Sequence, residues 1–360
     1  MRQGGESGAS LRPCTLAEFD GLQDMLSTAF GKKERDWFAI YRPQIFQRSA
    51  GSVRCHRIVT DRKGIAGVIG IYPLRFRVGR AVLNVGGVGS VAVRRDQRGR
   101  GLMSSMFRQT IRELEREGCD ISWLGGPRFR YALFGWDHGG RHVRFTVSRR
   151  NVRRWMPGLG PCAIRPVRHS DTPVLRRLYA TLGSGVVRSA CQWPVLLDHA
   201  EYVWEITSDR RAYLAAFRWG PDQVAEVAGA PRSVAGLLEA HARRWKLERL
   251  RVNTPQSARQ LDSVLFRIAD DFAVQHNHQV RVVNVQSTWR KLAPEIARQA
   301  RAAGNRDART LLRVRSPGDQ ALILRRALGF MDSVPPFPAS LSRFEWVRPV
   351  GWWMSYVDGV

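Results

Sequence analysis

Cysteine is scarce in this sequence and long apolar runs are missing, and each absence excludes a class of protein. The five cysteines in 360 residues are scattered, with neither CxxC spacing nor a cysteine–histidine pattern typical of a metal site. We therefore expect reduced thiols, no bound metal and a cytoplasmic location. No apolar run approaches the roughly 18 residues that a membrane span requires, so no membrane partner is expected.

Acidic residues are also few relative to basic ones. The 58 lysines and arginines, nearly all of them arginine, outnumber 31 acidic residues and give a net charge of +27. This charge favours an acidic partner such as coenzyme A phosphates, nucleic acid or a membrane surface, although GC-rich coding also enriches arginine. Hydrophobic residues reach 44%, enough for real cores, and the length suits two or more domains. Residues 1–9 lack an apolar signal core and are expected to form a loose tail.

The most informative stretch lies between residues 88 and 136. Residues 88–93 have the pattern of a strand, a basic turn with two glycines follows, and residues 102–117 have the periodicity of an amphipathic helix. A helix start offers unpaired backbone N–H groups and the positive end of the helix dipole to an anion. Gly99 and Gly101 allow a close backbone approach. The pattern predicts a phosphate-binding turn, and the plain alternative is an ordinary strand-to-helix connection.

Two landmarks of this stretch resemble those of the GNAT N-acetyltransferases. The run Arg98-x-x-Gly101-x-Met103 resembles the family's pyrophosphate motif R/Q-x-x-G-x-G/A, and Tyr131-x-x-Phe-Gly-Trp136 resembles its next landmark. Met103 stands where the motif usually has a small residue. The same departure is common in the enhanced-intracellular-survival (Eis-like) branch, which the sequence resembles. The resemblance implies that acetyl-CoA is the co-substrate. The groups expected to hold it are Val91, Ala92, Val93, Arg98, Gly99, Arg100, Gly101, Leu102, Met103, Ser104 and Gly126.

The expected element order over residues 10–155 is that of one GNAT domain with a mixed α/β sheet. A capping box at Thr15 and Glu18 opens the first helix, and residues 37–46 are expected to form a second helix or a lid over the acceptor site. Three strands follow, then the helix of residues 102–117, the strand of residues 121–124, a further helix and a last strand at residues 143–148. These residues are interpreted as the catalytic domain.

A second GNAT-like domain is expected over residues 162–285. Ile164-Arg165-Pro166 repeats Leu11-Arg12-Pro13 after 153 residues, and each triplet leads into a helix. Strands at residues 211–218, 223–228, 249–252 and 280–285 and a helix at residues 233–245 complete the repeat. This domain is expected to be degenerate, because it lacks an Arg-x-x-Gly turn and Pro231 removes an amide that a phosphate would need. The resemblance to the tandem Eis-like architecture implies a structural or acceptor-shaping role for it.

Residues 286–360 are interpreted as a short, basic, helical and aromatic C-terminal segment. The Eis-like pattern continues with a sterol-carrier-like domain of roughly a hundred residues, and the 75 residues available here are fewer. Basic helical runs in this segment are expected to present a solvated face. Its aromatic residues are expected to pack in a core, with insertion of the tail into the acceptor cleft as the alternative.

The predicted reaction is acetyl transfer from acetyl-CoA to a primary amine by direct attack on the thioester. Backbone N–H groups of residues 91–93 would polarise the carbonyl, and Tyr131, neutral at pH 7, would protonate the leaving thiolate as general acid. The resemblance to Eis-like enzymes implies that the terminal carboxylate, here that of Val360, lies near the tyrosine. The alternative bases are Glu18, His56 and His138.

Two other functions remain open at this point. One is a nucleic-acid-binding protein on a GNAT-like scaffold, which the charge permits although no recognition motif is present. The other is a catalytically inactive acyl-CoA-binding module. For the enzyme, the acceptor is a small-molecule or peptide amine of unidentified structure, and the oligomeric state, including a homo-oligomer, is left open.

Overall fold

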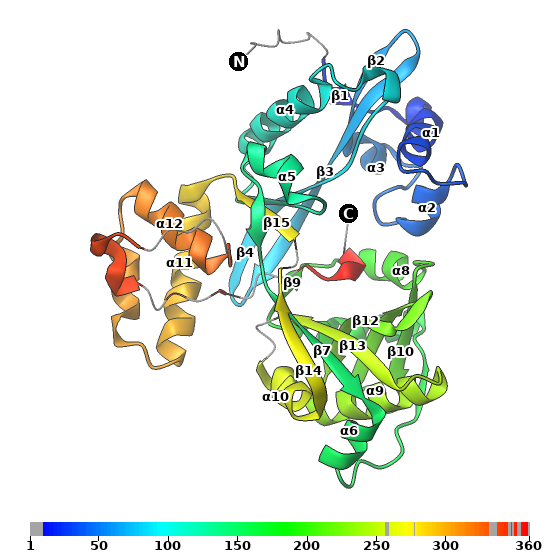
Figure 1. Ribbon diagram of the computed structural model, residues 1–360, viewed down its shortest axis with the longest axis vertical. Helices are drawn as coiled ribbons and strands as arrows, with labels where there is room; N and C mark the ends of the chain where they lie inside the picture. The colour runs from blue at the N-terminus through cyan, green and yellow to red at the C-terminus, as the bar shows by residue number, and fades with distance from the viewer. Residues whose placement is uncertain are drawn as a thin grey trace.

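The computed structural model describes residues 10–255, 259–276, 278–330, 337–344, 347, 349–350 and 354–358. The expected loose tail at residues 1–9 lies outside these ranges. Figure 1 shows two lobes along the long axis, each built around one sheet, with a helical C-terminal segment beside the upper lobe.

The upper lobe contains a mixed sheet in which most neighbours are antiparallel. In spatial order its strands are β1 (Arg12–Pro13), β2 (His56–Asp61), β3 (Gly64–Val78), β4 (Ala81–Val93), β5 (Ile121–Leu124), β15 (His278–Val282) and β6 (Asp137–Gly139), with β9 (Ser184–Val186) paired to β3. β4 and β5 are parallel, so a crossover has to join them, and α4 (Leu102–Arg116) provides it.

Helices cover both faces of this first sheet. α1 (Phe19–Ala29), α2 (Trp37–Tyr41) and α3 (Ala50–Arg54) lie on one face, where Leu22 and Val53 pack with Val68. α4 lies on the other face, where Met106 packs with Ile69. Because side chains alternate along β3, consecutive residues of that strand serve opposite cores.

The lower lobe repeats this topology. Its strands, in spatial order, are β8 (Ile164–Pro166), β10 (Tyr202–Thr207), β11 (Ala212–Phe217), β12 (Gly220–Gly229), β13 (Arg249–Pro255), β7 (His142–Ser148) and β14 (Ala269–Gln275). The helices packed with them include α6 (Arg149–Trp155), α7 (Thr172–Ala180), α8 (Gln192–Leu197), α9 (Pro231–Arg244) and α10 (Arg259–Ile268). β12 and β13 are parallel and α9 joins them, as α4 joins β4 and β5. The mixed α/β fold with tandem GNAT-like halves is therefore confirmed.

The two halves also share a detail at their first strands. The Arg12 guanidinium lies 2.6 Å from the carboxylate of Glu18, and the Arg165 guanidinium lies 2.7 Å from that of Asp171. In each half the arginine sits on the first strand and the carboxylate lies six residues later, at the start of the first helix. The repeated triplet in the sequence thus marks a repeated structural unit.

One strand of each half completes the sheet of the other lobe. β7 pairs antiparallel with β13 and β14 in the lower lobe, and β15 pairs antiparallel with β5 and β6 in the upper lobe. The assignment of residues 143–148 to the first sheet and of residues 280–285 to the second was therefore wrong. The physical reason is that the two strand positions are equivalent, so an alternating strand sequence fits either sheet. The exchange interlocks the lobes.

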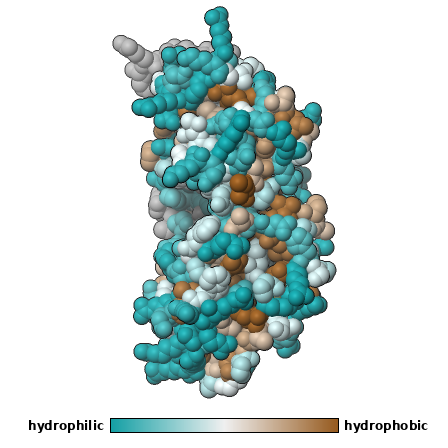
Figure 2. Space-filling view, turned by 90° about the vertical axis from the view of Figure 1, so that its right-hand side faces the viewer, coloured by the Kyte–Doolittle hydropathy of each residue, from teal (hydrophilic) through white to brown (hydrophobic). Residues whose placement is uncertain are grey.

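The C-terminal segment packs against the first sheet through α11 (Val285–Ala302), η5 (Arg306–Arg313) and α12 (Pro317–Ala327). Leu292 and Ile296 of α11 and Leu324 of α12 share one core with Phe76 and Val85 of the sheet. Phe344, in η6 (Ala339–Phe344), is fully buried in the same core, which confirms core packing for that aromatic residue. The face in Figure 2 is polar over most of its area, with scattered apolar residues. None of the described helices is long and apolar enough to cross a membrane.

Candidate active site

A gap in strand pairing creates the candidate site. β4 and β5 pair from Val85 with Ile121 to Val88 with Leu124, where β5 ends. β4 continues to Val93 without a partner on that side among the described strands. The backbone N–H and C=O groups of residues 89–93 that are not directed at β3 therefore face an opening, and they need a hydrogen-bond partner there. An extended ligand can pair with such an edge as another strand would.

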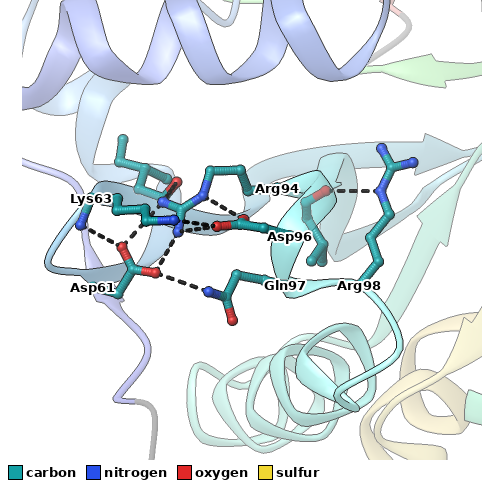
Figure 3. Close-up of polar contacts among 8 residues, drawn as sticks. Asp61, Lys63, Arg94, Asp96, Gln97 and Arg98 are labelled. Carbon is teal, nitrogen blue, oxygen red and sulfur yellow. Dashed lines mark hydrogen bonds and ion pairs between the residues drawn. The ribbon is translucent and has the colours of Figure 1, made fainter.

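The turn after β4 is held by a cluster of ion pairs. The Arg94 guanidinium bonds to Asp61, to Asp96 at 2.8 Å and to the carbonyl of Ile65 at 3.2 Å. Gln97 donates to the Asp61 carboxylate at 3.1 Å, and Figure 3 shows these groups converging. The bonds to Arg94 hold the pKa of Asp61 and of Asp96 below the usual range, and they raise the pKa of Arg94. Arg94 therefore stabilises the conformation of the turn.

Arg98 is directed away from this cluster, as Figure 3 shows. Its Nε donates to the carbonyl of Val93 at 3.2 Å, which orients the guanidinium and leaves its terminal nitrogens available. Gly99 and Gly101 both have a φ of +77°, and Gly101 is the N-cap of α4. Both glycines are therefore required by backbone conformation. A Cβ at either position would have no atom within 4 Å, so the backbone here is open to a ligand.

A cavity of about 650 Å³ lies where these elements meet. Nine of the eleven residues predicted to hold acetyl-CoA line it: Val91, Ala92, Val93, Arg98, Gly99, Gly101, Leu102, Met103 and Ser104. Arg100 and Gly126 do not. Ala29, Phe30, Gln97 and Arg130 also line it. Sequence reasoning missed the first two because only tertiary folding brings the end of α1 to the turn. The position of Arg130 next to Tyr131 in the sequence could have indicated that it lies at the site.

Tyr131 ends α5 (Arg128–Tyr131), which follows the Gly125–Gly126 turn. Its side chain is 9% exposed and its ring centroid lies 5.4 Å from that of Phe107. Gly126 has a φ of +123°, and a Cβ there would lie 2.9 Å from the tyrosine ring. This glycine therefore makes room for Tyr131. Burial raises the pKa of the tyrosine hydroxyl, so it is protonated at neutral pH. Tyr131 packs beside the 650 Å³ cavity wall without being part of it.

The exchanged strand β15 supports the segment around Tyr131 on both sides. Gln279 Nε2 donates to the carbonyl of Gly126 at 2.7 Å, and Arg281 Nη1 donates to the carbonyl of Phe134 at 2.6 Å. Sequence reasoning missed both residues because it assigned this strand to the second domain. The alternating pattern alone carried no signal of the sheet that β15 joins.

The predicted bases have different surroundings. Glu18 is bound by Arg12 and by the backbone and side chain of Thr15, which lowers its pKa to about 2. It is thereby a structural carboxylate, and the structure removes it as a base. His138 is half-buried, with its ring 5.7 Å from that of His276. His56 is buried beside Tyr72. Val360 lies outside the described residues.

A second cavity, of about 470 Å³, lies between the lobes. Gln44, Cys55 and Tyr72 line it from the upper lobe, and Cys191 and Leu196 line it from the lower lobe. Two charged residues, Arg188 and Asp358, also line it.

Arg188 and Asp358 anchor the end of the chain at this cavity. The buried Arg188 guanidinium bonds to the Glu226 carboxylate at 2.6 Å and to the Asp358 carboxylate at 2.7 Å. Asp358 belongs to η7 (Tyr356–Asp358), which lies between the two lobes in Figure 1. The carbonyl of Tyr356 also accepts a bond from the Tyr202 hydroxyl at 2.8 Å. The lower lobe thus holds the last described residues in the interlobe space.

Comparison with known proteins assigns the fold and the first domain. Residues 10–139 match the family described as Acetyltransferase (GNAT) domain, so the upper lobe carries a GNAT acetyltransferase domain. About three quarters of the chain shares its fold with solved GCN5-related N-acetyltransferases. One is the Kribbella flavida protein, at 18% identity and a TM-score of 0.59, over 76% of this chain and 72% of that one.

Two further solved structures agree. Eis1 from Mycobacterium abscessus has 13% identity and a TM-score of 0.59, over 79% of this chain and 76% of that chain. A probable N-acyltransferase of unknown function from Enterococcus faecalis has 15% identity and a TM-score of 0.61, over 79% and 75%. The predicted resemblance to GNAT proteins and to the Eis-like branch is therefore confirmed. No curated protein matches the sequence.

Proposed function

We propose that the protein is an acetyl-CoA-dependent N-acetyltransferase that acetylates a primary amine by direct attack on the thioester. The observation that carries the proposal is the divergence of β4 from β5 beside a cavity that nine predicted residues line. The unpaired edge of residues 89–93 would bind pantetheine as a strand, and the start of α4 with Arg98 would bind the pyrophosphate. Arg130, which reaches the same cavity, adds positive charge for phosphate.

The 470 Å³ cavity between the lobes is the proposed amine site. Tyr72 lines it from β3, directly across from Gly87 of β4, four to six residues before the stretch that lines the cofactor cavity. The Tyr72 hydroxyl also contacts Ser90 of β4, next to the stretch that lines the cofactor cavity, which suits a reaction between an amine in one cavity and a thioester in the other. Gly126, although outside the cofactor cavity, would contribute by making room for the Tyr131 ring.

In the proposed mechanism the chain's own residues orient the two substrates and supply one proton. Backbone N–H groups of residues 91–93 would stabilise charge on the thioester oxygen. Tyr131 would then give its proton to the thiolate that leaves, because its buried hydroxyl stays protonated at neutral pH. The ammonium proton would pass to water, or to the terminal carboxylate of Val360 if this lies within reach.

The test is turnover by purified protein and by Tyr131→Phe. A panel of amines is offered with acetyl-CoA, and release of the coenzyme A thiol is recorded. General acid catalysis is typically worth about 10²–10⁴-fold. We expect Tyr131→Phe to lower kcat by that order while coenzyme A affinity and Tm hold, because the ring and its packing against Phe107 remain.

Two results would contradict the proposal. If no amine accelerates thiol release although acetyl-CoA binds, the protein is an acyl-CoA-binding module. If Tyr131→Phe turns over at the wild-type rate per folded molecule, Tyr131 is not the acid. A lower Tm with unchanged turnover would show that the tyrosine is structural.

A further inference from the structure

The feature with no role so far is a strained serine at a bulge in β4. Val68 pairs with Ala92, whereas Gly70 pairs with Gly89, so Ser90 and Val91 together lie opposite a single residue of β3. Ser90 has a φ of +51°, in the left-handed region that favours glycine. Such strain is concentrated at functional sites, where bulges re-aim side chains.

The Ser90 hydroxyl is the end of a directional chain of hydrogen bonds. The Tyr72 hydroxyl donates to Ser90 Oγ at 2.7 Å, and His56 Nε2 lies 3.1 Å from the same Tyr72 oxygen. Because Tyr72 spends its one hydrogen on Ser90, the Nε2–H of His56 is the donor to Tyr72. Burial lowers the pKa of His56 to about 4, so the ring is neutral at pH 7 with one N–H. All hydrogens then run one way, and the Ser90 hydrogen is left to donate elsewhere.

The register of three strands makes room for this series of hydrogen bonds. His56 of β2 pairs with Gly70 of β3, which in turn pairs with Gly89 of β4. The Tyr72 hydroxyl lies over Gly70, where a Cβ would be only 2.0 Å from the hydroxyl oxygen. Tyr72 therefore bridges from β2 to β4 only because position 70 has no side chain. Tyr72 is 6% exposed and His56 is 1% exposed, so the bridge is fixed by packing.

Ser90 itself is half-buried, and its two neighbours in sequence and in space belong to different cavities. Val91, Ala92 and Val93, which follow it, line the proposed cofactor cavity, and Tyr72, which contacts it, lines the proposed amine cavity. This is the point where an amine and a thioester carbonyl would meet. In a chain of hydrogen bonds each donor polarises the next, so the terminal hydroxyl is a stronger donor than an isolated serine.

We propose that the Ser90 hydroxyl is a catalytic hydrogen-bond donor to the thioester carbonyl oxygen, with Tyr72 and His56 as positioning residues that orient it. The inference rests on the proposed acetyl transfer. The amine lone pair forms the C–N bond, the carbonyl π pair moves onto oxygen, and Ser90 stabilises that oxyanion while keeping its own proton. As the carbonyl re-forms, the C–S bond breaks, the thiolate takes the Tyr131 proton, the nitrogen loses one proton to water, and water returns one proton to the Tyr131 phenolate.

The test measures the carbonyl group of the bound thioester directly and needs no acceptor amine. Acetyl-CoA labelled with ¹³C at the carbonyl is bound to the wild type, Ser90→Gly and Ser90→Ala, and the carbonyl stretch is recorded by isotope-edited infrared spectroscopy. A hydrogen bond from Ser90 lowers the stretching frequency, so we expect the wild-type band at lower wavenumber than the band of either variant. Tyr72→Phe leaves the Ser90 hydroxyl without the bond that orients it. Its band should therefore lie between the wild-type band and the band of the serine variants.

The two serine variants separate chemistry from folding. Ser90→Gly relieves the strain of the φ of +51°, so it should keep or raise Tm, whereas Ser90→Ala keeps that strain and loses the bond from Tyr72, so it should lower Tm. Both should lose the band shift equally, and with an active amine both should lose about 10²-fold in kcat. Ser263→Ala removes an exposed hydroxyl that bonds to the Gln260 carbonyl in the lower lobe, and it should leave band and turnover unchanged.

The outcomes distinguish this inference from the proposed function. If acetyl-CoA binds and the carbonyl band is the same in wild type, Ser90→Gly and Ser90→Ala, Ser90 is not the donor although the acetyltransferase proposal stands. If the wild type does not bind acetyl-CoA at all, both proposals fail. A shift that disappears in the serine variants together with a retained Tm in Ser90→Gly supports the inference.

Discussion

Replacement of Arg98 by alanine should weaken coenzyme A binding far more than replacement of Arg100, although the two changes remove the same charge from the same turn. Arg98 lines the cofactor cavity, and its Nε bond to the Val93 carbonyl at 3.2 Å leaves the terminal guanidinium nitrogens for a phosphate. Arg100 does not line that cavity. A charge-assisted hydrogen bond contributes about 1.5–3 kcal/mol to binding. Screening by solvent at this exposed site brings the contribution toward the lower end of that range or slightly below it. We therefore expect Arg98→Ala to raise Kd about ten- to a hundredfold.

Titration calorimetry with coenzyme A and with dephospho-coenzyme A at two salt concentrations measures this difference. Arg100→Ala should raise Kd less than about threefold, and salt should suppress that small effect because it comes from long-range charge. The loss in Arg98→Ala should persist with both ligands, because they share the pyrophosphate. Equal losses in the two variants would refute the geometry and leave only a general attraction between a basic turn and an anion.

Two further substitutions test whether Gln279 positions the segment around Tyr131 and whether burial shifts the pKa of Asp262. Gln279→Leu removes the 2.7 Å bond to the Gly126 carbonyl, so kcat should fall several-fold while coenzyme A affinity holds; equal loss of both would mean that β15 only stabilises the fold. Burial raises the pKa of Asp262 to about 6 from 3.8, so the folded state binds the proton more tightly and the contribution of this residue to the free energy of unfolding should fall as pH rises from 4 to 6. Urea titrations should show that the wild type loses about 2–3 kcal/mol of stability relative to Asp262→Asn across that window, and parallel curves would contradict the shift.

The site was largely predictable because its residues are local in the sequence. A strand, two glycines at positive φ and a helix start occupy one continuous stretch, so spacing alone places Arg98, Gly99 and Gly101 around the cavity. Arg100 was assigned to the site by charge, but the turn does not bring it to the cavity wall. Sequence spacing could not decide which of two neighbouring arginines faces inward, because that depends on the ion pairs of Arg94.

Residues distant in sequence were missed for a different reason. Phe30 joins the cofactor cavity through the packing of α1, and Gln279 reaches Gly126 through a strand exchange between the lobes. The serine at the bulge was also overlooked. In the sequence, Ser90 looks like an ordinary strand residue, and only the register of β4 against β3 gives it a positive φ and a contact with Tyr72.

The sequence by itself determined the repeated fold, the glycine turn proposed to bind phosphate and the position of the tyrosine after it, because these follow from local periodicity, glycine conformation and short-range spacing. The tertiary structure decided which sheet β7 and β15 complete, because both sheets offer the same antiparallel position and hydrogen bonding does not distinguish them. It also decided that His56 and Tyr72 meet Ser90, because three strands have to come into register before a hydroxyl over Gly70 can join them.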